Sequence, residues 1–524
     1  MNTLTAIQDC TIVFNTLEEI TPIELFKDPE WNFGVFTLHI KKDIPLTKKH
    51  IHIFFTIDSS SSMWNTCNDG RTKMEHIQYT MKNMLRIFHE YKETNISIYV
   101  QSFDTIITAH IQDVLNIKDM CLQDLIKKIN DIESSGTTNI EIALQSARDN
   151  INKYQIMNPD HEVVHIFLTD GEITDGSKNK EILKSLVPKN CTNIFIGYGI
   201  EHDSELLYLL GSGYNNEYRF IDALEKSGMV YGEIIYGILY KAVEDTTILS
   251  TNCEIYDFVT NNWSSKLFIG NMIKEQIKYY HLRSKTPESC YVTVFGRNYM
   301  NLDEQTICNF NSRASLTKFI FRQKTQELLY DAREITKKID NTFDLFSDIF
   351  SESQDSYNPI NTSKNINTSK NEIKNKLYTF RSEMVKYMKD HEMESDTMMR
   401  MLCDDIYIVY KTIGKLVGAM FANSRQCSQG HQYSYACSVI PNRDNDDDYD
   451  YKYNNKTPYH TQDLFDEMEQ NEMEQNEMEQ NEMEQNEMEQ NEMTPYLSFG
   501  VATFMKEVSG DNIITGSTET QKII

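Results

Sequence analysis

Four features that would place a protein in a common class are missing from this 524-residue chain. Its ten cysteines include no Cys-x-x-Cys pair, which argues against a disulfide framework and for free thiols in a reducing compartment. Basic residues never form a run of five, and the net charge is −27, so neither nucleic acid nor an anionic membrane is an expected partner. No apolar run is long enough to span a membrane, and no signal peptide is visible. The sequence therefore predicts a cytoplasmic protein.

The negative charge is concentrated near the C-terminus. Residues 444–493 carry −16, which leaves −11 for the other 474 residues. Five copies of EMEQN fill Glu467–Asn491. A five-residue period advances about 140° per copy around a helix, so the methionines form no common stripe. We therefore expect residues 422–524 to be a low-complexity, largely disordered tail, the alternative for the repeats being a solvated, charged helix.

Between residues 49 and 244, apolar strands alternate with amphipathic helices. His50–Ile57 and Val163–Thr169 are strand-like runs, and Lys73–Tyr91 repeats apolar residues at helical spacing. This alternation predicts an α/β fold with a doubly wound, mostly parallel sheet. Ligands of such sheets bind at the carboxyl ends of the strands.

Short strands of antiparallel type flank the α/β region on both sides. Residues 1–48 and 245–311 are expected to form a small β-sandwich into which the α/β domain is inserted. Residues 312–421 are amphipathic and predict a helical region, with a linker near 352–371, where NTSKN occurs twice.

Three polar segments lie where this sheet should bind a ligand. The first strand ends in DSSSSM, which gives an Asp-x-Ser-x-Ser spacing at Asp58, Ser60 and Ser62. A loop before a helix reads SGTTNI and contains Thr138, and the strand Val163–Thr169 is followed by Asp170 in the sequence DGE. Because the three segments can reach one crevice, the sequence predicts a single site.

The oxygen atoms of these segments suit a hard cation, either Mg²⁺ or Mn²⁺. Alternate residues of an extended loop point the same way, so Ser60 and Ser62 can both present hydroxyls, with Thr138 supplying a third. If Asp58 and Asp170 act largely through water, the ion remains under-neutralised. An open coordination position would then attract an Asp or Glu carboxylate from a protein partner.

Taken together, the segments resemble the von Willebrand factor A domain with its metal-ion-dependent adhesion site. DSSSSM is similar to the family's Asp-x-Ser-x-Ser-Met, GTTNIEIAL to its Gly-Thr-Asn-Ile-x-x-Ala-Leu, and LTDGE to its Thr-Asp-Gly-Glu. The second loop has one extra threonine, and Thr138 matches better than Thr137 because it adjoins Asn139. The residues to which the resemblance assigns metal ligation are Asp58, Ser60, Ser62, Thr138 and Asp170.

The resemblance implies a metal-dependent protein–protein interaction. The alternative is a structural or virion assembly component in which the ion only stabilises a loop. An enzyme is not expected, since the chain has no G-x-S-x-G elbow, P-loop or H-E-x-x-H helix, and a Mg²⁺-dependent hydrolase is the less favoured reading. Richness in Asn, Ile, Lys and Tyr, with the pentapeptide repeat, is also similar to proteins of giant DNA viruses, which would place the protein in host cytoplasm or virion.

Two other groups of residues have weaker interpretations. Cys427, His431 and Cys437 are three soft ligands for zinc, but a fourth ligand at suitable spacing is missing. His50 and His52 alternate with isoleucines and are interpreted as residues on the faces of a strand rather than as metal ligands.

Overall fold

The structure, a computed structural model, describes most of the chain. The described residues are 6–16, 30–45, 49–67, 69–114, 116–213, 215–222, 226–298, 303–351, 359–414, 417–435 and 494–509. Within these ranges, no helix combines the length and the apolar character needed to cross a membrane. The predicted disorder of the EMEQN repeats concerns residues outside the described ranges.

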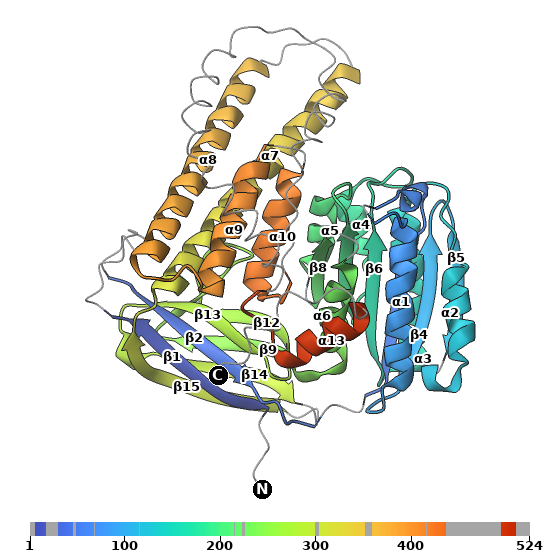
Figure 1. The fold of residues 1–524 in the computed structure, drawn as a ribbon, viewed down its shortest axis with the longest axis horizontal. Helices are drawn as coiled ribbons and strands as arrows, with labels where there is room; N and C mark the ends of the chain where they lie inside the picture. The colour runs from blue at the N-terminus through green and yellow to red at the C-terminus, as the bar shows by residue number, and fades with distance from the viewer. Residues whose placement is uncertain are drawn as a thin grey trace.

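The described residues form three regions: an α/β region, a β-rich region and a helical region (Figure 1). The α/β region contains a six-stranded sheet in the order β5-β4-β3-β6-β7-β8, which is parallel except for the antiparallel pair β4 and β5. This confirms the predicted mixed α/β domain with a mostly parallel sheet. Its strands are β3 (Ile51–Asp58), β4 (Ile96–Phe103), β5 (Ile107–Val114), β6 (Glu162–Thr169), β7 (Thr192–Tyr198) and β8 (Asn216–Ile221).

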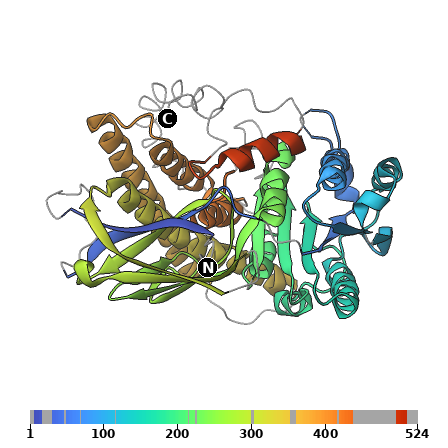
Figure 2. The ribbon, with the colours of Figure 1, turned by 90° about the horizontal axis from the view of Figure 1, so that it is seen from below.

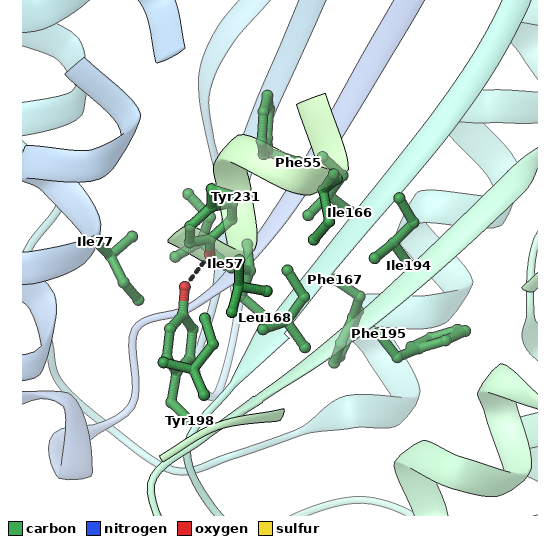
Figure 3. Close-up of a cluster of buried hydrophobic side chains, with 14 of the residues drawn as sticks. Phe55, Ile57, Ile77, Ile166, Phe167, Leu168, Ile194, Phe195, Tyr198 and Tyr231 are labelled. Carbon is green, nitrogen blue, oxygen red and sulfur yellow. Dashed lines mark hydrogen bonds between the residues drawn. The ribbon is translucent and has the colours of Figure 1, made fainter. Parts of the chain in front are cut away.

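Helices cover both faces of this sheet. They are α1 (Lys73–Glu90), α2 (Leu122–Asn130), α3 (Ile140–Met157), α4 (Lys180–Leu186), α5 (Ser204–Gly211) and α6 (Ser227–Leu239). Because side chains alternate along a strand, β3 buries Phe55 and Ile57 against the helices α1 and α6 on one face (Figure 3). On the other face Phe54 packs with Ala147 and Ile151 of α3. Every residue of β3 is buried, which is why its sequence is mostly apolar, with His52, Thr56 and Asp58 as the exceptions.

The strands before and after the α/β region belong to one nine-stranded sheet, in the order β11-β10-β13-β2-β1-β15-β14-β9-β12. Its last strand in the chain, β15, pairs with β14 through residues 303–309 and with β1 through residues 310–314, so it joins two halves that enclose one apolar core. The strands are β1 (Ile7–Asn15), β2 (Asn32–Ile40), β9 (Lys241–Thr251), β10 (Glu254–Asp257), β11 (Asn262–Ser264), β12 (Lys266–Ile273), β13 (Ile277–Ser284), β14 (Tyr291–Asn298) and β15 (Asp303–Ala314). The α/β region is thus inserted between β2 and β9.

The helical region contains α7 (Thr317–Ser351), α8 (Pro359–Asp390), α9 (Thr397–Thr412) and α10 (Gly418–His431). Its core is rich in methionine and includes Met384, Met399 and Leu402. One expectation is corrected here. Both NTSKN copies lie within α8, so the predicted linker near 352–371 is mostly helical, and only residues 352–358 fall outside the described structure.

The expected boundary of the tail is also corrected. Residues 422–435 continue α10 and the segment after it, and α13 (Phe499–Ser509) packs beside α6 and α1, as the red helix in Figures 1 and 2 shows. The two described segments meet, since the Thr494 N–H donates a 3.0 Å hydrogen bond to the Ser434 carbonyl. The C-terminal part of the chain therefore returns to the α/β region after the repeats.

Candidate metal centre

Two fully buried carboxylates mark the centre of the carboxyl edge of the six-stranded sheet. Asp58 ends β3 and Asp170 follows β6, and these two strands are neighbours in the sheet. Asp58 accepts hydrogen bonds from the Ser60 backbone N–H at 2.8 Å and from the Thr169 hydroxyl at 2.6 Å. The register of the two strands thus brings together acidic residues that are 112 positions apart in the chain.

Two serine hydroxyls connect the loop after β3 to Asp170. The Ser62 hydroxyl donates to Asp170 Oδ1 at 2.7 Å, and its oxygen lies 3.0 Å from that of Ser60. Ser62 belongs to the single-turn helix η1 (Ser61–Trp64) and Ser60 precedes it, and the contact between their oxygens shows that the two side chains lie together. The predicted pair of hydroxyls therefore faces the predicted carboxylate.

The hydroxyl of Thr138 lies close to that of Ser62, beside the residue that follows Asp170. A Cβ atom placed on Gly171 would lie 3.6 Å from Ser62 Oγ and 3.7 Å from Thr138 Oγ1, so both oxygens face this glycine. Thr138 is 3% exposed and is fixed by its backbone N–H, which donates to the Thr174 hydroxyl at 2.8 Å. By contrast, the Thr137 hydroxyl contacts that of Thr105 at 3.0 Å. All five residues predicted from the sequence thus meet at one place.

The electrostatics of the centre follow from burying two carboxyl groups side by side. Burial, and then the charge of Asp170, raises the pKa of the Asp58 carboxyl to about 7, against the opposing effect of hydrogen bonds from Ser60 and Thr169. Two adjacent buried carboxylates are costly unless a positive charge lies nearby.

Two charged residues beside the centre were not predicted from the sequence. The Lys73 ammonium, at the start of α1, lies 2.7 Å from Asp170 Oδ2 and 3.3 Å from Glu201 Oε2. Burial acts to lower the pKa of Lys73, but the charges of Asp170 and Glu201 outweigh it and raise the pKa above its usual value. No signal in the sequence identifies this contact, because Asp170 and Glu201 lie 97 and 128 residues further along the chain.

The donor set fits a hard divalent cation. Three hydroxyls and two carboxylates supply only oxygen, which favours Mg²⁺ or Mn²⁺ over soft metals. No cluster of three or more His, Cys, Asp or Glu side chains is placed to hold a metal within the described ranges, and this centre is not such a cluster because most of its donors are hydroxyls.

The alternative zinc ligands do not form a described site. Cys427 is buried in α10, and the ring of His431 stacks on Tyr433 at 5.1 Å between centroids. The third residue, Cys437, lies outside the described residues.

Comparison with known proteins gives a family match for part of the chain. Residues 52–229 match the family model described as the von Willebrand factor type A domain. No curated protein matches the chain.

Several solved structures are similar in outline. A von Willebrand factor type A protein from Catenulispora acidiphila is 13% identical, with 65% of this chain and 83% of that chain covered and a TM-score of 0.43. The ArnB paralogue VWA2 from Sulfolobus acidocaldarius is 16% identical, with 81% of this chain and 99% of that chain covered and a TM-score of 0.44. Proximal thread matrix protein 1 from the mussel byssus, with a zinc-occupied metal-ion-dependent adhesion site (MIDAS) motif, is 16% identical, with 40% of this chain and 50% of that chain covered and a TM-score of 0.31.

These TM-scores all lie below 0.5, so the assignment rests on the family model and on the sheet that carries the matched residues. The matched span begins in β3 and ends in α6, and it encloses all five residues of the candidate centre. Residues 52–229 of this chain are a von Willebrand factor type A domain.

Proposed function

We propose that this protein binds another protein through a divalent metal ion held at the carboxyl edge of its α/β region. Ser60, Ser62 and Thr138 would hold Mg²⁺ or Mn²⁺, with Asp58 and Asp170 beside it. When bound, the ion would supply a Lewis-acidic position for a partner's Asp or Glu carboxylate. The observation that carries the proposal is the convergence of three hydroxyls on two fully buried carboxylates.

The loops around the centre also expose large apolar side chains. Trp64 is 60% exposed, yet its indole N–H donates to the Ser134 carbonyl, which fixes the ring. Ile106 is 64% exposed at the turn between β4 and β5, next to Thr105, which contacts Thr137. A partner segment that carries an acidic residue flanked by apolar residues would fit this surface. The metal ion would bind the carboxylate, and Trp64 and Ile106 would contact the flanking apolar residues.

The alternative is a structural or assembly role in which the ion only fixes the loops. The loops are also tied directly to one another, since the Ser135 hydroxyl donates to Asp104 and the Ser61 hydroxyl donates to the Gly136 carbonyl. We favour the interaction role because these hydrogen bonds leave Trp64 and Ile106 on the surface. The proposal includes no catalytic step and places the protein in the cytoplasm.

The first test is metal binding by the full chain. Thermal unfolding of the wild type and of Asp170→Ala is followed with Mg²⁺, Mn²⁺ and Zn²⁺. At about a hundredfold excess over its dissociation constant, an ion that binds only the native state contributes about 2.7 kcal/mol. We expect Mg²⁺ or Mn²⁺ to stabilise the wild type and not the variant. Equal shifts in both folded proteins would rule out this centre.

The same experiment continues with a displayed library of random peptides, selected in Mg²⁺ and in chelator. Selection of Asp- or Glu-containing peptides in Mg²⁺ alone is expected, and peptides that lack these residues or bind equally in chelator would support the structural alternative. The substitution Ile106→Ser should weaken binding of the selected peptides. Its matched control is Ile156→Ser, since Ile156 is 82% exposed at the far end of α3, about 24 Å from its first residue.

A further inference from the structure

Lys73 is built into the wall of the candidate metal centre. It is the first residue of α1, directly after Thr72, whose hydroxyl accepts from the Glu75 N–H while the Glu75 carboxylate accepts from the Thr72 N–H. This capping box fixes the start of the helix and therefore the direction in which Lys73 leaves it. The lysine side chain is only 12% exposed. Its position is set by the fold rather than by solvent.

The Lys73 ammonium binds the oxygen of the Asp170 carboxylate that does not accept from the Ser62 hydroxyl. Asp170 is fully buried, its Oδ1 accepts from Ser62 at 2.7 Å, and its Oδ2 accepts from Lys73 at the same distance. The second partner of the ammonium, Glu201, is 52% exposed at the rim. Lys73 therefore lies between the buried centre and its surface.

Formal charges show what this contact does to an entering cation. With both carboxyls ionised, Asp58 and Asp170 give the buried centre −2, and Lys73 reduces this to −1. A divalent ion then leaves the centre at +1, so a partner carboxylate restores neutrality. Without Lys73, the ion alone would neutralise the two aspartates, and a further carboxylate would bring an excess negative charge. Glu201 counts for less because water screens it.

We propose that Lys73 is an internal counter-ion that weakens binding of the metal alone and thereby couples metal uptake to binding of the partner's carboxylate. The inference rests on the proposed function and adds a regulation to it. Coupling of this kind is reciprocal, so the carboxylate must also tighten the metal. A metal-free centre would remain stable because its buried charge is already partly neutralised.

The experiment is calorimetric titration of the full-length protein with Mg²⁺, with folding checked by circular dichroism. Lys73→Met is expected to lower the Mg²⁺ dissociation constant about tenfold or more, while Lys73→Arg, which keeps the charge, should stay near the wild type. Lys180→Met is the matched control, since Lys180, at the start of α4, pairs with Glu205 at 3.0 Å and with Asp203 at 3.7 Å. An unchanged or weaker affinity of Lys73→Met would overturn the inference and leave the metal site standing.

A second arm measures the coupling with acetate as the carboxylate. Replacing chloride by acetate at matched ionic strength should lower the Mg²⁺ dissociation constant of the wild type, and lower it less in Lys73→Met. An equal effect of acetate on both proteins would overturn the coupling. If neither folded protein binds Mg²⁺ or Mn²⁺ at all, the proposed function itself fails, because Lys73→Met is the more favourable case for an ion.

Discussion

Two adjacent threonines behave differently because of where their hydroxyls are held. Thr138 is buried, and its carbonyl accepts from the backbone N–H groups of Thr174 and Asp175 at 3.1 and 3.3 Å, which ties it to the loop that carries Asp170. Thr137 contacts Thr105 in the neighbouring hairpin. The sequence could rank these two residues only through a resemblance, whereas their contacts give each a separate role.

Thr138→Ala should therefore weaken Mg²⁺ binding by about tenfold or more, since loss even of a residue that only supports a metal ligand has an effect of this size. Thr138→Ser, which keeps the hydroxyl, should largely retain binding. Thr137→Ala serves as the matched control and should leave the Mg²⁺ dissociation constant close to the wild-type value in calorimetry. The reverse pattern would assign the ligand to Thr137.

The five residues that the sequence predicts as metal ligands lie together in the structure, but Lys73, which lies beside them, was not predicted. The five occur in short motifs whose strand and loop context can be recognised locally. Lys73 occurs at the start of an ordinary amphipathic helix, and its partner Glu201 follows a different strand, β7. Only the order of strands in the sheet brings these residues together, and a single sequence does not give that order.

At the scale of elements, the packing of α13 on α6 depends on two glycines. A Cβ atom on Gly232 would lie 2.4 Å from the Met505 Cα, and one on Gly228 would lie 2.5 Å from the Ser509 Cα. Both distances are to backbone atoms, which cannot move aside without moving α13. The close approach also explains why α6 is buried on nearly all sides, like a helix in the core of a protein.

Gly232→Ala is accordingly expected to displace α13 and lower the free energy of unfolding by about 1–3 kcal/mol, the usual cost of overpacking. Gly237→Ala, on the same helix, meets no atom within 4 Å and should be neutral or should stabilise the chain by up to about 1 kcal/mol through helix propensity. Urea denaturation of the two variants measures the difference. Equal stability would show that α13 does not need the close approach.

Helices and strands could be predicted from the sequence where burial gives them a recognisable apolar pattern. The strands of the parallel sheet could be predicted because they are mostly apolar, as in Val163–Thr169, where His165 is the exception. The boundary between α6 and β9 has no comparable signal in the sequence: α6 ends at Leu239 and β9 begins at Lys241. The apolar run crosses that boundary, because both elements are buried there. The NTSKN segments lack apolar periodicity, so their helix was not visible either.

At the scale of the whole molecule, one buried arginine connects the α/β region to the end of the helical region. The Arg219 guanidinium, from β8, lies 2.7 Å from a carboxylate oxygen of Glu233 in α6 and 3.2 Å from the centre of the Tyr433 ring. The Tyr433 hydroxyl donates to Glu217 at 3.0 Å, and the Ser434 N–H donates to Glu233 at 2.7 Å. Tyr433 and Ser434, which follow α10, are thus bound to charged side chains of β8 and α6 in the α/β region.

Arg219→Met should destabilise the full chain by about 3–5 kcal/mol, because it leaves Glu233 and Glu217 without their buried counter-ion. The control Arg148→Met removes a surface contact with Asp149, at 3.3 Å, and should change stability by no more than about 0.5 kcal/mol. Denaturant unfolding compares the two. A similar small cost for both would mean that the cluster around Arg219 contributes little to holding the regions together.

The hydrogen bond between Thr494 and Ser434 has a consequence for the acidic repeats that lie between them. Because Ser434 and Thr494 are in contact, the 59 residues between them begin and end at the same point of the fold. The entropy of closing such a loop grows only with the logarithm of its length, and one more five-residue copy would change it by less than about 0.1 kcal/mol. The number of EMEQN copies therefore has almost no effect on the free energy of folding, and forms of this protein with more or fewer copies would keep the same folded regions.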